Sequence, residues 1–137
     1  MVSTSPKKHT LLYVDDDRDT LVLMEEIFSS ENYTVITKLS GEEGLKYIKE
    51  NGSVSVVVSD FVMTGMNGLE FLKEVKSFSP ATKRCLCSGS FDRGKLEAKV
   101  KDKELDSFIM KPVTIDTMLT TVEGLIKEYE KKLPFYR

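Results

Sequence analysis

The sequence has no tryptophan, only one histidine and two cysteines, and no apolar run near the ~20 residues that span a bilayer. Neither sign of charge dominates, because 20 lysines and arginines nearly balance 22 aspartates and glutamates, leaving a net charge of −2. No strong overall field therefore attracts nucleic acid or an anionic membrane. Residues 1–10 are polar and lack the apolar core of a signal peptide. We expect a cytoplasmic protein with no nucleic-acid or membrane partner.

The scarcity of cysteine and histidine argues against a zinc site or a disulfide framework. Cys85 and Cys87 lie two residues apart in a predicted strand, where they share one face and suit a disulfide poorly. A Cys-x-Cys pair can bind metal, but His9 is the only histidine and there is no second cysteine pair. We predict buried, reduced thiols.

A chain of 137 residues fits one domain. Its hydrophobic fraction of 40% and charged fraction of 31% are typical of a globular protein and argue against wholesale disorder. We predict a polar, flexible leader over residues 1–9, a single domain over residues 10–132, and a tail over residues 133–137.

Short apolar runs alternate with amphipathic segments along the predicted domain. The runs predict five strands, at residues 11–14, 33–38, 54–59, 84–87 and 107–110. The segments between and after them predict five helices, at residues 18–30, 40–51, 67–79, 92–102 and 114–132. The second predicted helix begins with a capping box at Ser40, and Asn67 can cap the third. Strands separated by helices imply an α/β fold with a parallel sheet and helices on both faces.

Polar side chains follow four of the five predicted strands, at the carboxyl ends where such folds bind ligands. They are Asp15, Asp16 and Asp17 after the first strand, Asp60 after the third, Ser88 after the fourth and Lys111 after the fifth. Converging carboxylates repel one another and favour a bound cation, and oxygen ligands without His or Cys favour Mg²⁺. Lys111 and Ser88 can bind a phosphate, and a carboxylate beside them can attack phosphorus. The residues predict a Mg²⁺-assisted site that accepts a phosphoryl group.

Five motifs resemble those of response-regulator receiver domains, the CheY-like family of two-component signalling, and the resemblance covers residues 10–132. They are Val14-Asp15-Asp16-Asp17, Val57-Val58-Ser59-Asp60, Met63-x-Gly65-Met66-Asn67-Gly68, Leu86-Cys87-Ser88-Gly89 and Lys111-Pro112. The resemblance implies a flavodoxin-like (βα)5 fold, a doubly wound parallel five-stranded sheet in the order 2-1-3-4-5.

The resemblance also implies how the phosphoryl group is handled. Asp60 would be the phosphoacceptor, with Lys111 as the phosphate-binding cation after a cis Lys111–Pro112 peptide bond. Ser88 would be the switch hydroxyl and Phe108 the switch aromatic.

A metal site follows from the same resemblance. Mg²⁺, or Mn²⁺ in its place, would be held by Asp16 and Asp60, by Asp15 through a bound water, and by the backbone carbonyl of Val62. The sequence departs from the family pattern at one position beside this site, where Thr64 replaces the usual proline. We expect that change to alter the stiffness of the loop and not the chemistry.

The function implied is that of a stand-alone receiver in a bacterial-type two-component phosphorelay. It would take a phosphoryl group from a phosphohistidine on a sensor histidine kinase or a histidine phosphotransfer protein. It would be a switch and a phosphoprotein, without turnover of an external substrate. Phosphorylation would change the face built from the fourth helix, fifth strand and fifth helix, for a downstream partner or a phosphorylation-dependent homodimer.

Two other readings of the acidic segment remain open. Residues 15–26 match the ligand positions of an EF-hand calcium loop, although Thr20 stands where the sharp turn requires glycine. Asp15 and Asp17 also resemble the nucleophile motif of haloacid-dehalogenase-type phosphohydrolases, in which Asp15 would take the phosphoryl group.

Overall fold

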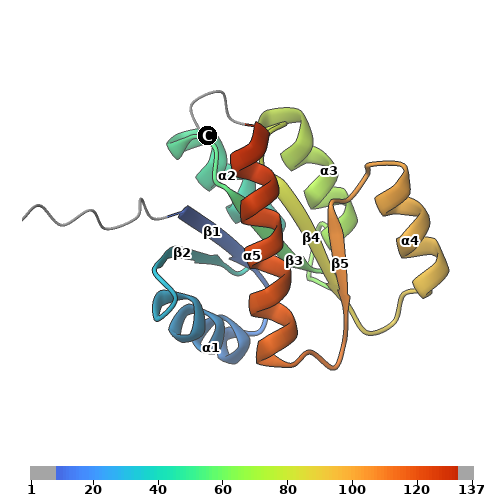
Figure 1. The fold of residues 1–137 in the computed structure, drawn as a ribbon, viewed down its shortest axis with the longest axis horizontal. Coiled ribbons are helices and arrows are strands. Elements are labelled where there is room, and N and C mark those ends of the chain that lie inside the picture. The colour runs from blue at the N-terminus through green and yellow to red at the C-terminus, as the bar shows by residue number, and fades with distance from the viewer. Residues whose placement is uncertain (1–8, 133–137) are drawn as a thin grey trace, which may run out of the picture.

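The computed structural model describes residues 9–132, in which five strands and five helices alternate along the chain (Figure 1). The strands are β1 (His9–Val14), β2 (Tyr33–Lys38), β3 (Val56–Asp60), β4 (Lys83–Ser88) and β5 (Ser107–Met110). The helices are α1 (Arg18–Ser29), α2 (Gly41–Asn51), α3 (Gly68–Phe78), α4 (Arg93–Lys101) and α5 (Ile115–Lys132). The tail and all but one residue of the predicted leader lie outside the described residues, so the domain boundaries stay a prediction.

The strands form one parallel sheet in the order β2-β1-β3-β4-β5. The central strands are in register, with Leu11 opposite Val35 of β2 and Val56 of β3. The predicted fold class and strand order are therefore confirmed.

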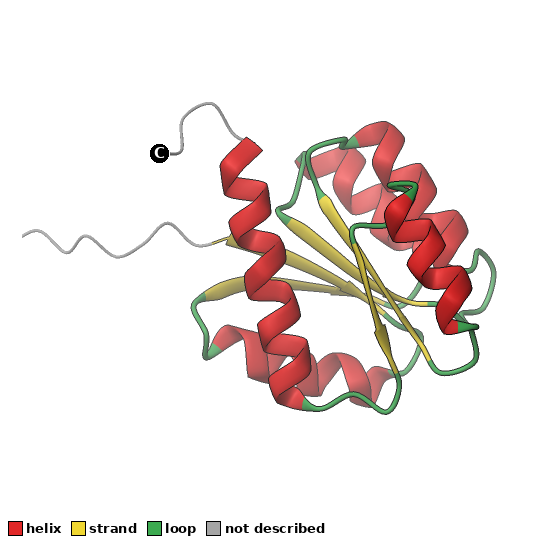
Figure 2. Ribbon diagram, turned by 45° about the vertical axis from the view of Figure 1, so that its right-hand side comes forward, coloured by secondary structure: helices red, strands yellow, loops and turns green. Residues whose placement is uncertain are grey.

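Helices cover both faces of the sheet, and the strand residues alternate between the two cores (Figure 2). Leu11 and Tyr13 pack with residues of α1 and α5, whereas Leu12 and Val14 pack with residues of α2, α3 and α4. A parallel strand buried on both faces needs apolar residues at every position. This is why residues 11–14, the buried part of β1, are all apolar in the sequence.

The strand boundaries differ most from the prediction at β1, which begins two residues earlier at His9, and at β3. Val54 is only 2% exposed, but its carbonyl accepts the Thr82 hydroxyl, and β3 begins two residues later at Val56. Half of the capping box predicted at Ser40 is confirmed, because the Ser40 side chain accepts the Glu43 N–H at the start of α2. A reciprocal capping box forms at Asn67 and Glu70.

Both cysteines are free and buried on the α1 and α5 side of the sheet, as predicted. Burial raises the pKa of Cys87 to about 11, against the opposing charge of Lys111. The thiols are therefore protonated core groups.

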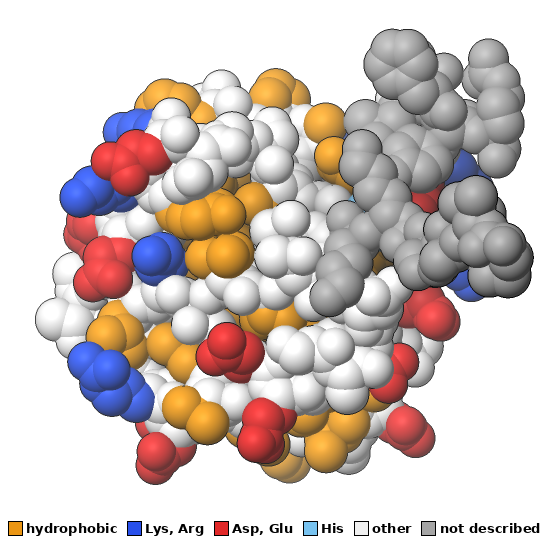
Figure 3. All heavy atoms as spheres, turned by 90° about the vertical axis from the view of Figure 1, so that its left-hand side faces the viewer, with side chains coloured by type: hydrophobic (Ala, Val, Ile, Leu, Met, Phe, Trp, Pro, Cys, Tyr) orange, Lys and Arg blue, Asp and Glu red, His pale blue; other side chains and the backbone are white. Residues whose placement is uncertain are grey.

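The surface carries mixed charge. On the face drawn in Figure 3, acidic, basic and hydrophobic side chains lie interspersed. Among residues 9–132, none of the helices combines the length and the apolar character needed to cross a membrane.

Gly68 provides a test of how tightly α3 is set against the end of β3. A Cβ at this position would lie 2.2 Å from the backbone oxygen of Asp60 and 2.9 Å from the Cα of Phe61. We predict that Gly68→Ala lowers the free energy of unfolding in urea by about 1–3 kcal/mol, because backbone must move to admit the methyl group. Gly124→Ala in α5 is the control, since nothing lies within 4 Å of its Cβ, and it should be neutral or stabilising. Equal effects of the two substitutions would contradict the close approach.

Candidate functional site

The three consecutive aspartates after β1 have different environments. Asp15 is buried, and its Oδ1 accepts the Asp17 N–H at 3.0 Å. Asp17 is the N-cap of α1, where it accepts the Asp19 N–H and the Thr20 hydroxyl. Asp16 is exposed. Asp17 therefore starts the helix, and Asp15 and Asp16 remain for the site.

Asp60 at the end of β3 forms an ion pair with Lys111 at the end of β5. The Lys111 Nζ lies 2.6 Å from Asp60 Oδ1, and the Asp60 side chain is 10% exposed. The Lys111 N–H donates to the Ser88 carbonyl at 2.9 Å, which fixes the end of β5 against the end of β4. The Lys111–Pro112 peptide bond is cis, as predicted.

Asp15, Asp16 and Asp60 form an acidic triad, in which one carboxylate oxygen of each lies within 4.8 Å of the others. Burial and the neighbouring charge of Asp60 raise the pKa of Asp15, although the Asp17 N–H opposes them. Burial works against the Lys111 ammonium, but its hydrogen bond and charge interaction with Asp60 outweigh this and raise the Lys111 pKa. One cation thus faces three clustered carboxylates.

The acidic triad fits a divalent cation of the kind predicted. Its donors are carboxylate oxygens, which suit Mg²⁺ or Mn²⁺ better than soft metals. One member, Asp16, is open to solvent, so an ion has a route of entry. Val62, predicted to add a backbone carbonyl, lies in the loop after β3 with 64% of its surface exposed, and its role as a ligand stays a prediction.

Ser88 ends β4 next to this cluster. Only 1% of the residue is exposed, and its Oγ accepts the N–H groups of Ser90 and Phe91 at 3.3 and 3.2 Å. The Phe91 ring packs edge-on against Phe61, the residue after Asp60, with centroids 4.9 Å apart. The loop after β4 is therefore held to the ends of both β3 and β4.

Phe108 on β5 is half-buried and packs with the α2, α3 and α4 core. The Arg93 guanidinium at the start of α4 lies 5.6 Å from the centroid of its ring. This contact joins β5 to the start of α4 through Phe108, the residue predicted to be the switch aromatic.

Two sets of hydrogen bonds at the site were not predicted from the sequence. Thr64 donates its N–H and its hydroxyl to Asp16 Oδ2, at 3.2 and 3.4 Å. Glu42 of α2 accepts the Met66 N–H at 3.3 Å and so anchors the same loop. The only available signal was Thr64 itself, because a proline in its place would have no N–H to give.

The EF-hand reading of residues 15–26 is wrong. A strand precedes the acidic segment where a helix is required, and α1 begins at Arg18, inside the proposed loop. The acidic cluster pairs Asp15 with Asp60, which is distant in sequence, and not with the later positions of a calcium loop.

Comparison with known proteins agrees with the fold described above. The family model for the response regulator receiver domain matches residues 11–123. The hydrogenase transcriptional regulatory protein HoxA of Cupriavidus necator is 31% identical over 123 residues, which are 90% of this chain and 25% of that protein. The chemotaxis protein CheY of Listeria monocytogenes is 29% identical over 119 residues, 85% of this chain and 98% of that protein.

A solved structure gives the same result. The receiver domain protein (CheY-like) from Methanospirillum hungatei JF-1 superposes with a TM-score of 0.83 at 27% identity, covering 93% of this chain and all of that one. The chain thus spans about a quarter of HoxA and nearly the whole of CheY.

We predict that the acidic triad binds Mn²⁺, used here as a paramagnetic substitute for Mg²⁺. Amide signals near Asp15, Asp16 and Asp60 should broaden at low Mn²⁺ concentration. Asp16→Asn should weaken binding about tenfold or more, equivalent to about 1.4 kcal/mol, because it removes one charged ligand. Asp19→Asn, an exposed carboxylate outside the triad, is the matched control. Similar affinities for the two variants would place the ion elsewhere.

Proposed function

Because this chain belongs to the response regulator receiver domain family, we propose that it accepts a phosphoryl group on Asp60. Receiver domains are signalling domains of two-component systems. The observation that carries the proposal is the Lys111–Asp60 ion pair of 2.6 Å inside the acidic triad. The pair supports the proposal because the Asp60 carboxylate, the proposed nucleophile, lies next to a cation that could bind a phosphoryl oxygen.

The reaction transfers phosphorus from nitrogen to oxygen. A carboxylate oxygen of Asp60 attacks the phosphorus of a phosphohistidine, the P–N bond breaks, and its electron pair stays on the departing imidazole. The donor class would be a sensor histidine kinase or a histidine phosphotransfer protein. The product is an aspartyl phosphate, and the chain acts as an acceptor and switch without turnover of an external substrate.

The residues around Asp60 have distinct tasks in this step. Lys111 holds Asp60 in place and then neutralises the incoming phosphoryl oxygens. Asp15 and Asp16 would hold Mg²⁺ together with Asp60. The ion, when bound, would offset the repulsion between the carboxylates and the phosphoryl oxygens. Thr64 fixes Asp16 through the two hydrogen bonds to its Oδ2.

Ser88 is suited to sense the phosphoryl group. Its Oγ accepts two backbone N–H groups, and no described residue accepts its hydroxyl proton. That proton is therefore available to a new oxygen acceptor at Asp60, and donating it would pull the loop of residues 89–91 toward the site. The pull would reach the core through the Phe91–Phe61 contact.

The response would appear on the α4–β5–α5 face. Phe108 lies on β5 beside β4, where Leu86 is its register partner. A change of its rotamer would break the contact between its ring and Arg93 and release the start of α4. Phosphorylation can drive this change only by stabilising one state more than the other. The altered face would serve a downstream partner or a symmetric homodimer.

The site of phosphorylation tests the proposal and separates it from a haloacid-dehalogenase-type enzyme. We predict that a labelled phosphodonor marks Asp60 in peptide mapping, and that Asp60→Asn abolishes the label because an amide is not a competent nucleophile. Asp19→Asn is the control and should label like the wild type. Label on Asp15 would instead support the phosphohydrolase reading, and full labelling of Asp60→Asn would reject the assignment.

Ser88→Ala tests the coupling between the site and the α4–β5–α5 face. We predict that the variant still binds beryllofluoride and Mg²⁺, since Asp60 and Lys111 are intact, but loses most of the amide shift changes over residues 92–130. Ser90→Ala is the matched control, because only its backbone N–H is engaged with Ser88. A full wild-type response in Ser88→Ala would show that the switch runs through other residues.

A further inference from the structure

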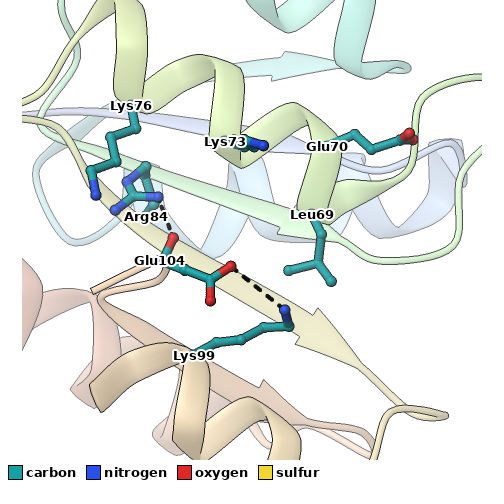
Figure 4. A pocket seen from close by; sticks show the side chains of 7 residues that line it. All are labelled: Leu69, Glu70, Lys73, Lys76, Arg84, Lys99 and Glu104. Atoms are coloured by element: carbon teal, nitrogen blue, oxygen red, sulfur yellow. Dashed lines mark hydrogen bonds and ion pairs between the residues drawn. The ribbon is translucent and has the colours of Figure 1, made fainter. Parts of the chain in front are cut away.

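A cavity lies between α3 and α4, alongside β4 and apart from the residues of the acidic triad (Figure 4). Its volume is about 310 Å³, at the lower end of the range for small-molecule sites. It is lined by Leu69, Glu70, Lys73, Lys76, Arg84, Lys99 and Glu104. The cavity therefore has room for a small organic molecule.

One part of the lining is apolar. The Leu69 side chain projects from α3 into the space that faces Lys99 of α4 (Figure 4). The aliphatic stems of the neighbouring lysines extend this surface, because lysine carries a four-carbon chain below its charge. A ligand would need an apolar portion to cover it.

The charges around the cavity are unbalanced. Lys73 has no hydrogen bond or ion pair with any described residue, and Lys76 donates only to the uncharged Lys103 carbonyl at 3.2 Å. Of the two carboxylates, Glu70 accepts the Asn67 N–H and Glu104 pairs with Lys99 at 3.6 Å. Lys73 and Lys76 thus lack an anionic partner.

Arg84 makes the back of the cavity rigid. It is only 4% exposed, and its guanidinium donates to the carbonyls of Lys103, Glu104 and Leu72. These bonds tie the segment after α4 to α3 and β4. The cavity is therefore a preformed feature, which reduces the cost of binding.

We propose that this cavity binds a small organic anion with an apolar body. Its carboxylate or phosphate group faces Lys73 and Lys76, and its apolar part lies against Leu69. α4 is held to the core by few contacts, since Leu96 is its one buried side chain. A ligand that touches Leu69 of α3 and Lys99 of α4 would therefore add a contact between the two helices. The site is independent of phosphoryl transfer at Asp60.

Three probes test the proposal on the ¹⁵N-labelled chain. Naphthalene-1-sulfonate combines an apolar ring system with an anion, 1-naphthol keeps the rings without the strong acid, and sulfate keeps only the charge. We expect saturable amide shifts with the sulfonate at residues 69–76, 84 and 96–104, and much weaker binding of the other two. Equal binding of 1-naphthol, or shifts centred elsewhere, would overturn the proposal.

A pair of lysine variants locates the anion. Lys73→Gln should weaken binding of naphthalene-1-sulfonate about threefold to tenfold, because it removes an unpaired cation from the cavity. Lys127→Gln on α5 is the matched control, since that lysine is exposed and lies outside the cavity lining. Both side chains are exposed, so neither change should unfold the chain. Equal loss of affinity in the two variants would reduce the binding to general charge attraction and reject the site.

Discussion

The ion pair between Lys111 and Asp60 is the interaction on which the carboxyl edge of the sheet depends. One carboxylate oxygen each of Asp15, Asp16 and Asp60 lies within 4.8 Å of the other two, and Asp15 and Asp60 are buried. Such a cluster is unfavourable without a cation, because like charges at short range repel and burial removes the water that would screen them. Lys111 supplies one positive charge, so the three carboxylates keep an excess of negative charge. For this reason we expect the acidic triad to bind a divalent cation.

The parallel sheet brings these groups together without requiring the loops to be long. The central strands β1, β3 and β4 pack against helices on both faces, and every strand except β2 carries polar site residues at its carboxyl end. Backbone contacts then hold the ends in place, as when Gly68 donates its N–H to the Phe61 carbonyl and the Lys111 N–H bonds to Ser88. Backbone hydrogen bonds therefore hold the site at Asp60, and the loops after β3 and β4 are tied to it through Thr64 and Ser88.

The sheet, its helices and the residues of the site were predictable because each leaves a local signal. β1 and β3 each contain a short apolar run followed closely by aspartate, and the motifs around Asp60, Ser88 and Lys111 occur in the order of a known family. The hydrogen bonds from Thr64 to Asp16 were not predictable, because they depend on how two loops distant in sequence meet. The α3–α4 cavity was hidden for a similar reason. Its lysines come from two different helices, and only the packing shows that they line one cavity and that Lys73 has no partner among the described residues.

The most direct test of phosphoryl transfer is the intact mass of the wild-type chain after incubation with a small-molecule phosphodonor, with Mg²⁺ and with Mg²⁺ removed by a chelator. We predict the addition of a single phosphoryl group with Mg²⁺ and little or none without it, because the acidic triad repels the donor until a cation is bound. No addition in the presence of Mg²⁺, or equal addition in its absence, would contradict the account.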